Sequence, residues 1–358
     1  KPEITIMSSV FGRIFKISTF GESHGPAVGV VIEGVPAGIP LDLKNIQTEL
    51  DRRRPGTSKF VSQRNERDTA EILSGTAEGK TLGSPIAVVV KNTQARSKDY
   101  EELKNVFRPG HADYTYFKKF GIKPQPGGGR ASGRETVGRV AAGAVAKSLL
   151  APLGIQIRAF VRSVHNLVGL KIDLDFSESH PLRCADPNVA TEMENVVQKA
   201  LRDGDSLGGI VEVLIKGVPP GLGDPVFNKL DALFGWAFFS IGGVKGVEIG
   251  SGFAVCKMMG SECNDQITSD GFETNNAGGI LGGISTGQDI VVRLAVKPTP
   301  SISQTQRTIN IDNKNELINI KGRHDPCICP RVVPVAEAMA ALVLAVAYLF
   351  QRSVSRNT

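Results

Sequence analysis

The chain has 358 residues, of which 41% are hydrophobic and 22% charged, and its formal net charge is +6. That length and hydrophobic content are enough for a large buried core. Acidic and basic residues are mixed along the chain, and aromatic residues make up 6% of it, which argues against a protein that stacks bases of single-stranded nucleic acid. The excess of positive charge suits small, strongly anionic ligands.

Localisation and redox state follow from three further features. No hydrophobic signal region follows Lys1, and the longest apolar stretch, Ala338–Phe350, is shorter than the roughly 20 residues that span a bilayer. The five cysteines form no Cys-x-x-Cys pair, which favours reduced thiols, although Cys327 and Cys329 leave a redox pair open. We therefore expect a cytoplasmic protein with no membrane segment and no metal site.

Short segments rich in valine and isoleucine, bounded by glycine or proline, predict strands. They are Arg13–Phe20, Val28–Gly34, Ile86–Val90, Ile155–Val168, Ile210–Gly217, Gly246–Val255 and Asp289–Lys297. Several follow one another with no helical pattern between them. This favours an α+β fold with antiparallel sheets over a doubly wound parallel sheet.

Apolar residues at helical spacing predict three helices. The first contains Leu43–Leu50, with Asp42 as its N-cap, and the second spans Val137–Leu149. The third, Val335–Tyr348, is apolar nearly all round, as a buried helix should be.

No long stretch of proline, serine and glycine divides the chain into separate parts. Residues 11–358 are therefore predicted to form a single domain. Residues 1–10 are interpreted as an N-terminal extension, in which the residues ahead of Met7 are an expression remnant.

Two histidines lie in short segments of glycine, proline and charged residues, His24 in Gly21–Gly25 and His111 in Arg108–Asp113. Histidine gives or takes a proton near neutral pH, and the glycines allow a ligand to approach closely. Two such loops predict an enzyme that handles two separate proton transfers.

Two basic clusters predict anion binding. Gly127–Glu135 places three glycines, Arg130 and Arg134 at the start of a helix, which suits a phosphate group better than an ordinary turn. Arg52–Arg54 and Lys59 follow the first helix, where the helix dipole alone would favour cations. Three successive arginines cannot share one helix face, so at least one is expected to point inward or at a ligand.

Three further segments carry polar groups. Gly322–Cys327 holds a base, an imidazole and a carboxylate ahead of a proline, and Lys297–Ser301 ends a strand with one cation and two hydroxyls. Asn275–Ile284 is a glycine-rich loop that either holds a flat ligand or turns the chain. No segment has the spacing of a metal site or of a serine or cysteine nucleophile, and these residues alone do not identify a substrate.

Taken together, the motifs resemble those of the chorismate synthase family. The resemblance runs in the family's order from near Phe11 to near Val346. It rests on Phe20–Gly25, Asp51–Gly56, Phe107–Asp113, Gly127–Arg134, Ala277–Gly283 and Gly322–Cys327. It implies a lyase of the shikimate pathway that forms chorismate by 1,4-anti elimination of phosphate and a ring proton from 5-enolpyruvylshikimate 3-phosphate. Reduced FMN is required without net redox change, and the family has a β-α-β sandwich fold and assembles as a homotetramer.

The resemblance also implies roles for individual residues. His24 would protonate the departing phosphate, His111 would protonate or stabilise the reduced flavin, and Asp325 would act through flavin N5 to complete removal of the ring proton. FMN would contact Arg130, Ala131, Ser132, Gly242, Gly243, Gly282, Lys297, Pro298, Thr299, Pro300, Ser301 and Arg323. Substrate anions would meet Arg53, Lys59, Arg108, Arg134 and Arg323. Lys59 replaces an arginine that is common in the family, which turns a bidentate contact into a point charge.

The sequence leaves two alternative functions open. An ordinary FMN oxidoreductase would share the flavin contacts but turn over a redox substrate, and a nucleic-acid-binding protein is suggested by the positive charge alone. Some members of the family reduce their own flavin with NADPH. No obvious large insertion would add that function here, so an external flavin reductase is the expected partner.

Overall fold

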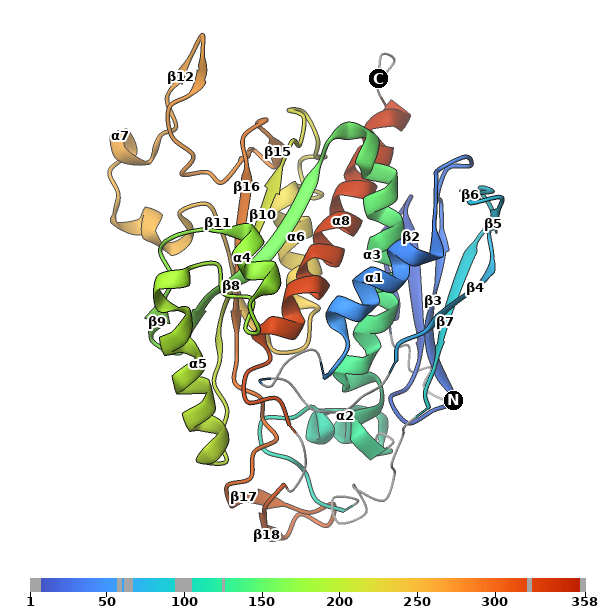
Figure 1. Ribbon diagram of the computed structural model, residues 1–358, viewed down its shortest axis with the longest axis vertical. Helices are drawn as coiled ribbons and strands as arrows, with labels where there is room; N and C mark the ends of the chain where they lie inside the picture. The colour runs from blue at the N-terminus through green and yellow to red at the C-terminus, as the bar shows by residue number, and fades with distance from the viewer. Residues whose placement is uncertain are drawn as a thin grey trace.

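Two five-stranded sheets enclose a layer of helices in the computed structural model, which describes residues 8–56, 60, 67–93, 105–123, 126–320 and 324–354 (Figure 1). Every pairing between the named strands is antiparallel. The predicted α+β class and the β-α-β sandwich are therefore confirmed.

The first sheet has the order β1-β2-β3-β7-β4. Its strands are β1 (Val10–Phe11), β2 (Lys16–Gly21), β3 (Ala27–Glu33), β7 (Ile86–Lys91) and β4 (Ala70–Ser74). On the central strand β3, Val28, Val30 and Ile32 alternate toward the helical layer and are buried, as the period of two requires. The predicted strands Arg13–Phe20 and Val28–Gly34 are present within one to three residues of their expected ends.

The second sheet has the order β11-β16-β10-β8-β9. Its strands are β11 (Val244–Ile249), β16 (Ile290–Val296), β10 (Gly209–Lys216), β8 (Gln156–Val164) and β9 (Leu167–Val168). Two of the predicted strands differ from the structure. Ile155–Val168 is divided by a turn in which His165 has a φ of 53°, and Gly246–Val255 ends at Ile249 because Gly250 has a φ of 59°.

Four helices fill the layer between the sheets, α1 (Leu43–Arg53), α3 (Thr136–Leu150), α6 (Leu230–Phe239) and α8 (Cys329–Val354). Figure 1 shows α3 beside β2 and β3, and α8 beside β8 and β10. The two central helices pack closely because Gly143 of α3 has no side chain, and a Cβ there would lie 2.5 Å from the Cα of Ala338. The side chain of Asp42 caps α1 by accepting from the Lys44 N–H, as predicted.

Helix α8 is longer than the predicted segment Val335–Tyr348 and contains Pro334. By length and composition it could cross a membrane, but 89% of an 18-residue apolar window is buried inside the protein. It is therefore the central core helix, and its apolar surface is explained by packing against α3 and the second sheet.

The remaining elements surround this sandwich. Helices α4 (Leu174–Ser179) and α5 (Pro187–Arg202) lie against β8 and β9. At the lower end in Figure 1 are α2 (Asp113–Phe120), β17 (Gln306–Ile309) and β18 (Asn315–Ile318), and at the upper left are α7 (Gly260–Cys263) and β12 (Ile267–Thr268). The other short elements are β5 (Thr76–Ala77), β6 (Lys80–Thr81), β13 (Gly271–Phe272), β14 (Ile280–Leu281), β15 (Ile284–Ser285), η2 (Pro126–Ala131), η3 (Gly133–Glu135), η4 (Ala151–Leu153) and η5 (Gly252–Lys257).

Candidate active site

A cavity of about 840 Å³ lies where α1 ends and where α3 and α8 begin. Its lining brings together most of the segments that the sequence singled out, from the loop of His24 near the start of the chain to Asp325 near its end. Among the predicted residues that line it are His24, Arg53, Arg108, His111, Arg130, Ala131, Ser132, Arg134, Gly242, Gly243, Lys297, Pro298, Thr299, Pro300, Ser301 and Asp325. One cavity therefore holds the three predicted catalytic residues and most of the predicted ligand contacts.

One predicted contact among the described residues, Gly282, is not part of this lining, and the structure does not test two others. Gly282 lies in the turn between β14 and β15, so the cavity gives it no support as a flavin contact. Lys59 and Arg323 lie outside the residues that the structure describes.

The two histidines face the same glycine-rich loop. Gly127, Gly128 and Gly129 have positive φ angles of 80°, 96° and 52°. A Cβ on Gly127 would collide with the ring of His24, and a Cβ on Gly128 would lie 3.0 Å from Cε1 of His111. Only glycine both adopts these positive φ angles without strain and lacks the Cβ atom for which there is no room here. The triple glycine therefore brings both rings close to the start of α3.

His24 is held in a loop between β2 and β3. The hydroxyl of Ser23 lies 3.2 Å from the Nδ1 of His24. Asn92 ties the loop to the end of β7 by donating to the carbonyls of Glu22, at 2.9 Å, and Gly25, at 2.7 Å. The ring is therefore oriented from its Nδ1 side by a loop that is itself anchored to the first sheet.

His111 belongs to a compact charged cluster with Arg108 and Asp113. One oxygen of Asp113, Oδ1, lies 2.8 Å from Nδ1 of His111, and both carboxylate oxygens accept from Arg108, at 2.6 and 2.8 Å. Burial alone would raise the pKa of Asp113, but hydrogen bonds from His111 and Arg108 and their charges hold it well below its usual range. The ionised carboxylate fixes Arg108 and orients the His111 ring at the same time.

A second buried carboxylate, Asp68, is shared by two cavity arginines. Its Oδ2 accepts from Arg53 at 2.6 Å and its Oδ1 from Arg134 at 2.5 Å. Of the three successive arginines, Arg53 is the one that lines the cavity, which agrees with the prediction that at least one of them points inward or at a ligand. Arg52 instead pairs with Glu337 of α8, at 2.6 Å, in the helical layer.

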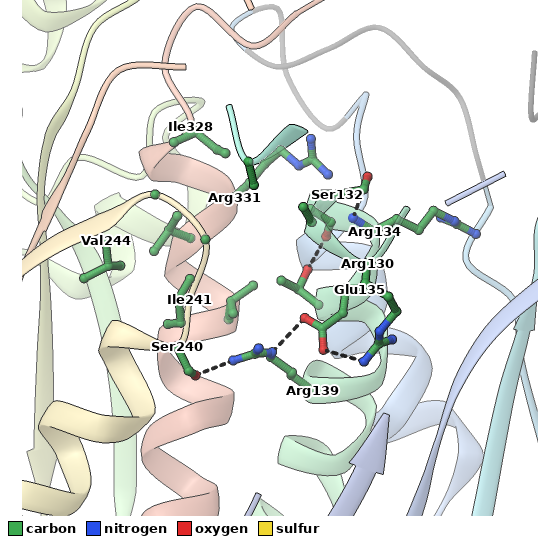
Figure 2. Close-up of a pocket in the computed structure, with 18 of the residues that line it drawn as sticks. Arg130, Ser132, Arg134, Glu135, Arg139, Ser240, Ile241, Val244, Ile328 and Arg331 are labelled. Atoms are coloured by element: carbon green, nitrogen blue, oxygen red, sulfur yellow. Dashed lines mark hydrogen bonds and ion pairs between the residues drawn. The ribbon is translucent and has the colours of Figure 1, made fainter. Parts of the chain in front are cut away.

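A third cluster lies at the first turn of α3, and sequence reasoning missed it. Figure 2 shows Arg139 between Ser240 and Glu135, with Arg130 on the other side of Glu135. Nε of Arg139 lies 2.8 Å from Oε2 of Glu135, and Nη2 of Arg130 lies 3.7 Å from Oε1. Glu135 and Arg139 are four residues apart at the start of a helix, a spacing that places two side chains on the same helix face, so this ion pair could have been predicted from the sequence.

Two further contacts lie in the lining of the cavity, one at Asp325 and one at Lys297. Arg331 of α8 lies 2.8 Å from Oδ2 of Asp325, and Lys297 donates to the carbonyl of Gly110 at 2.5 Å. Thr299 Oγ1 is buried and has no hydrogen-bond partner among the described residues. A buried hydroxyl of this kind in a cavity wall suits a polar group of a bound ligand.

The described residues show neither a metal-binding cluster nor a disulfide. Within the described ranges, no three His, Cys, Asp or Glu side chains are grouped so that they could hold a metal ion. Cys327 and Cys329 are both buried and are not joined by a disulfide.

The family model for chorismate synthase matches residues 15–349. The chain belongs to the chorismate synthase family. A chorismate synthase from Methanosarcina mazei is 55% identical over 346 residues, which cover 94% of this chain and 95% of that protein. One from Chloroflexus aurantiacus is 54% identical over 349 residues, which cover 96% of each.

A crystal structure of a chorismate synthase superposes with a TM-score of 0.76 at 34% identity, covering 95% of this chain and 93% of that one. The likeness runs through nearly the whole chain and confirms the fold class. Because the chorismate synthase relatives are enzymes, this member of the family is an enzyme, and the cavity with its two histidines is its candidate active site.

Proposed function

We propose that the protein converts 5-enolpyruvylshikimate 3-phosphate to chorismate, the last common step of the shikimate pathway to the aromatic amino acids, as a carbon–oxygen lyase. The observation that carries the proposal is the placement of His24 and His111 against adjacent glycines of one loop, in a cavity with six arginines among its described lining residues. Two proton-transfer groups beside a strongly cationic wall suit the elimination of phosphate from a polyanion.

The arginines fit the charges of the substrate, which carries one phosphate and two carboxylates. Arg53, Arg108 and Arg134 are each held by a buried carboxylate, so their guanidinium planes are fixed before the substrate arrives. Such preorganised donors cost little reorganisation when the charge moves during the reaction. We assign these three to the substrate.

His24 is assigned as the acid that protonates the departing phosphate. Ser23 contacts the Nδ1 side of the ring, so we place the transferred proton on Nε2. A protonated phosphate is less charged and is a better leaving group, the usual contribution of general acid catalysis.

His111 and Asp325 are assigned to the flavin and to the removal of the ring proton. Asp113 holds Nδ1 of His111, and the opposite nitrogen, Nε2, lies on the side of Gly128, where we propose that it holds a proton toward the flavin. Asp325 is assigned as the final acceptor of the ring proton. Arg331, 2.8 Å from its Oδ2, orients that carboxylate.

Reduced FMN is the proposed cofactor, and the wall of the cavity fits it. Thr299 presents a buried hydroxyl without a partner among the described residues, and a Cβ on Gly242 would meet open space, so a planar ring can approach the backbone there. Arg130 and Lys297 supply positive charge for a phosphate. When bound, reduced flavin would lend an electron to the bond that breaks and take it back, so the reaction has no net redox change.

The proposal is tested under anaerobic conditions with 5-enolpyruvylshikimate 3-phosphate and either reduced or oxidised FMN. Phosphate release with reduced FMN, and none with oxidised FMN, is expected. An ordinary FMN oxidoreductase would bind the flavin but release no phosphate from this substrate, and that result would exclude the lyase.

We further propose that the protein works in the cytoplasm and receives reduced FMN from a separate flavin reductase. An aerobic assay with NADPH and FMN but no added reductase should then give no chorismate. Turnover under those conditions would show instead that the chain reduces its own flavin.

A further inference from the structure

A second, smaller cavity of about 280 Å³ lies between α6, the last turns of α8 and the turn that follows β1. The turn after β1 is held against α8 at Gly12, whose φ is 86°, because a Cβ there would lie 3.3 Å from Cγ2 of Val346. A loop between β10 and α6 completes the lining. The cavity is thus built from three segments that are distant in the sequence.

Most of this lining is apolar, and it includes four aromatic side chains, Phe11, Phe227, Trp236 and Phe350. Binding sites for small molecules are commonly apolar and aromatic, with a few polar groups that orient the ligand. A dry apolar cavity of roughly 150 Å³ holds one benzene molecule. A cavity of about 280 Å³ therefore suits one aromatic ring that carries a short substituent.

Two side chains of opposite charge lie in the same lining, Arg13 and Asp224. Among the described residues, Arg13 has no hydrogen bond or ion pair, so it is not paired with Asp224. Asn228 orients the carboxylate of Asp224 by donating from Nδ2 to Oδ2 at 2.8 Å. A guanidinium and a carboxylate that are not paired with each other suit the two charges of one zwitterion.

The second cavity shares an aromatic wall with the candidate active site. Phe11 and Trp236 line both cavities, and their ring centroids are 4.5 Å apart. One turn further along α6, Ser240 accepts from Arg139 at 2.5 Å in the larger cavity. A ligand in the second cavity would therefore touch side chains that also face the candidate active site.

We propose that the second cavity binds an aromatic amino acid. The ring packs among the aromatic side chains, the carboxylate meets Arg13 and the ammonium meets Asp224. Neither of these charged residues lines the larger cavity, so the site is separate from the contacts assigned to FMN and to the substrate. The proposal does not depend on the proposed function.

The test uses the full chain and L-phenylalanine as the probe. The chain has one tryptophan, so its fluorescence reports on Trp236 alone, and L-phenylalanine does not absorb where tryptophan is excited. Titration should change this fluorescence in a saturable way and should release or absorb heat in a calorimeter. Phenethylamine lacks the carboxylate and 3-phenylpropanoate lacks the ammonium, so each should bind roughly tenfold more weakly.

Variants assign the signal to the second cavity, because Trp236 also faces the larger one. Arg13→Gln and Asp224→Asn should each weaken L-phenylalanine binding roughly tenfold, since each removes one charge partner. Arg202→Gln is the matched control, because Arg202 is an exposed arginine at the end of α5 that lines neither cavity. It should bind L-phenylalanine as wild type does.

Neither heat nor a fluorescence change with millimolar L-phenylalanine would overturn the proposal. Equal binding of all three compounds would overturn it too, because the two charges would then have no role. Binding that Arg13→Gln and Asp224→Asn both leave unchanged would place the ligand in the larger cavity instead. Fluorescence that changes with protein concentration, but not with L-phenylalanine, would show that a second copy of the chain fills the cavity.

Discussion

At the scale of single residues, the cavity depends on glycines whose role the sequence did not reveal. The sequence predicts a phosphate site at Gly127–Glu135 and two separate proton transfers at the histidine loops. In the structure the two features are one, because the rings of His24 and His111 pack against Gly127 and Gly128. Residue type and local spacing identified each segment, but neither predicts a contact such as that of His24 with Gly127, which is distant in the sequence.

Replacing Gly127 by alanine should damage the reaction more than the fold. Its Cβ would strike the ring of His24, which must move from its position, and turnover should fall roughly 100-fold or more. Gly154→Ala is the control, since Gly154 also has a positive φ, of 72°, but a Cβ there would meet open space. It should cost about 1 kcal/mol of stability and leave turnover unchanged. Steady-state rates and urea unfolding of both variants test this, and equal rates in the two would contradict it.

The two histidines should each be essential for rate. We expect His24→Ala and His111→Ala to lower turnover by roughly 100- to 10,000-fold, the usual contribution of general acid–base catalysis. Far-ultraviolet circular dichroism should show both variants folded. Near-normal turnover in both would mean that the proton transfers belong to other groups.

At the scale of secondary-structure elements, the helical layer is joined by a buried ionic cluster. Glu337 of α8 is 1% exposed and lies 2.6 Å from Arg52 of α1 and 2.8 Å from Lys147 of α3. It also accepts from the N–H of Ala159 in β8 at 3.0 Å. One carboxylate thus connects three helices and a sheet. Apolar spacing predicted the three helices, but Pro330 and Pro334 interrupted the pattern at the start of α8, so its first turns were missed.

Burial alone would raise the pKa of Glu337, but the charges of Lys147 and Arg52 and their hydrogen bonds lower it well below its usual range. A carboxyl group with a lowered pKa in the folded state stabilises the protein at pH values above its unfolded pKa, about 4.3, and this stabilisation is lost as the pH falls. Glu337→Gln should therefore lower the free energy of unfolding by about 3–5 kcal/mol at pH 7, because two cations lose their partner.

The difference between Glu337→Gln and wild type should narrow as the pH drops below about 4.3. Glu71→Gln serves as control, since its ion pair with Lys91 is exposed and should contribute at most about 1 kcal/mol. Urea unfolding at a series of pH values measures both variants. A difference for Glu337→Gln that stays constant down to acid pH would refute the ionic role of this residue.

At the scale of the whole molecule, the sequence predicted the class of fold and most of the segments that line the cavity, but neither the place of Arg139 and Ser240 in it nor the pairing of buried charges. The Asp68–Arg134 contact spans 66 positions and the Arg52–Glu337 contact spans 285. Such pairs depend on the packing of the two sheets on the helices, which no local pattern encodes. Helices α5 and α6 were also missed, although Asp186 and Pro187 are an ordinary N-cap and first residue for α5.

We also expect the protein to assemble as a homotetramer in solution. Several large apolar side chains are exposed on the single chain, among them Phe227 at 92% and Phe253 at 75%. Exposed apolar surface of this kind is commonly covered by association. Light scattering coupled to size-exclusion chromatography should give four times the chain mass of 38.2 kDa. A monomer at micromolar concentration would contradict the expectation.

The stoichiometry of an anaerobic reaction shows whether this cavity eliminates phosphate without net redox change. Wild type would be mixed with limiting reduced FMN and a large excess of 5-enolpyruvylshikimate 3-phosphate, while chorismate, phosphate and the absorbance of the flavin are followed together. We expect one phosphate for each chorismate, many turnovers for each flavin, and a flavin that is still reduced at the end. Oxidation of one flavin for each product formed, or consumption of substrate without phosphate, would contradict it.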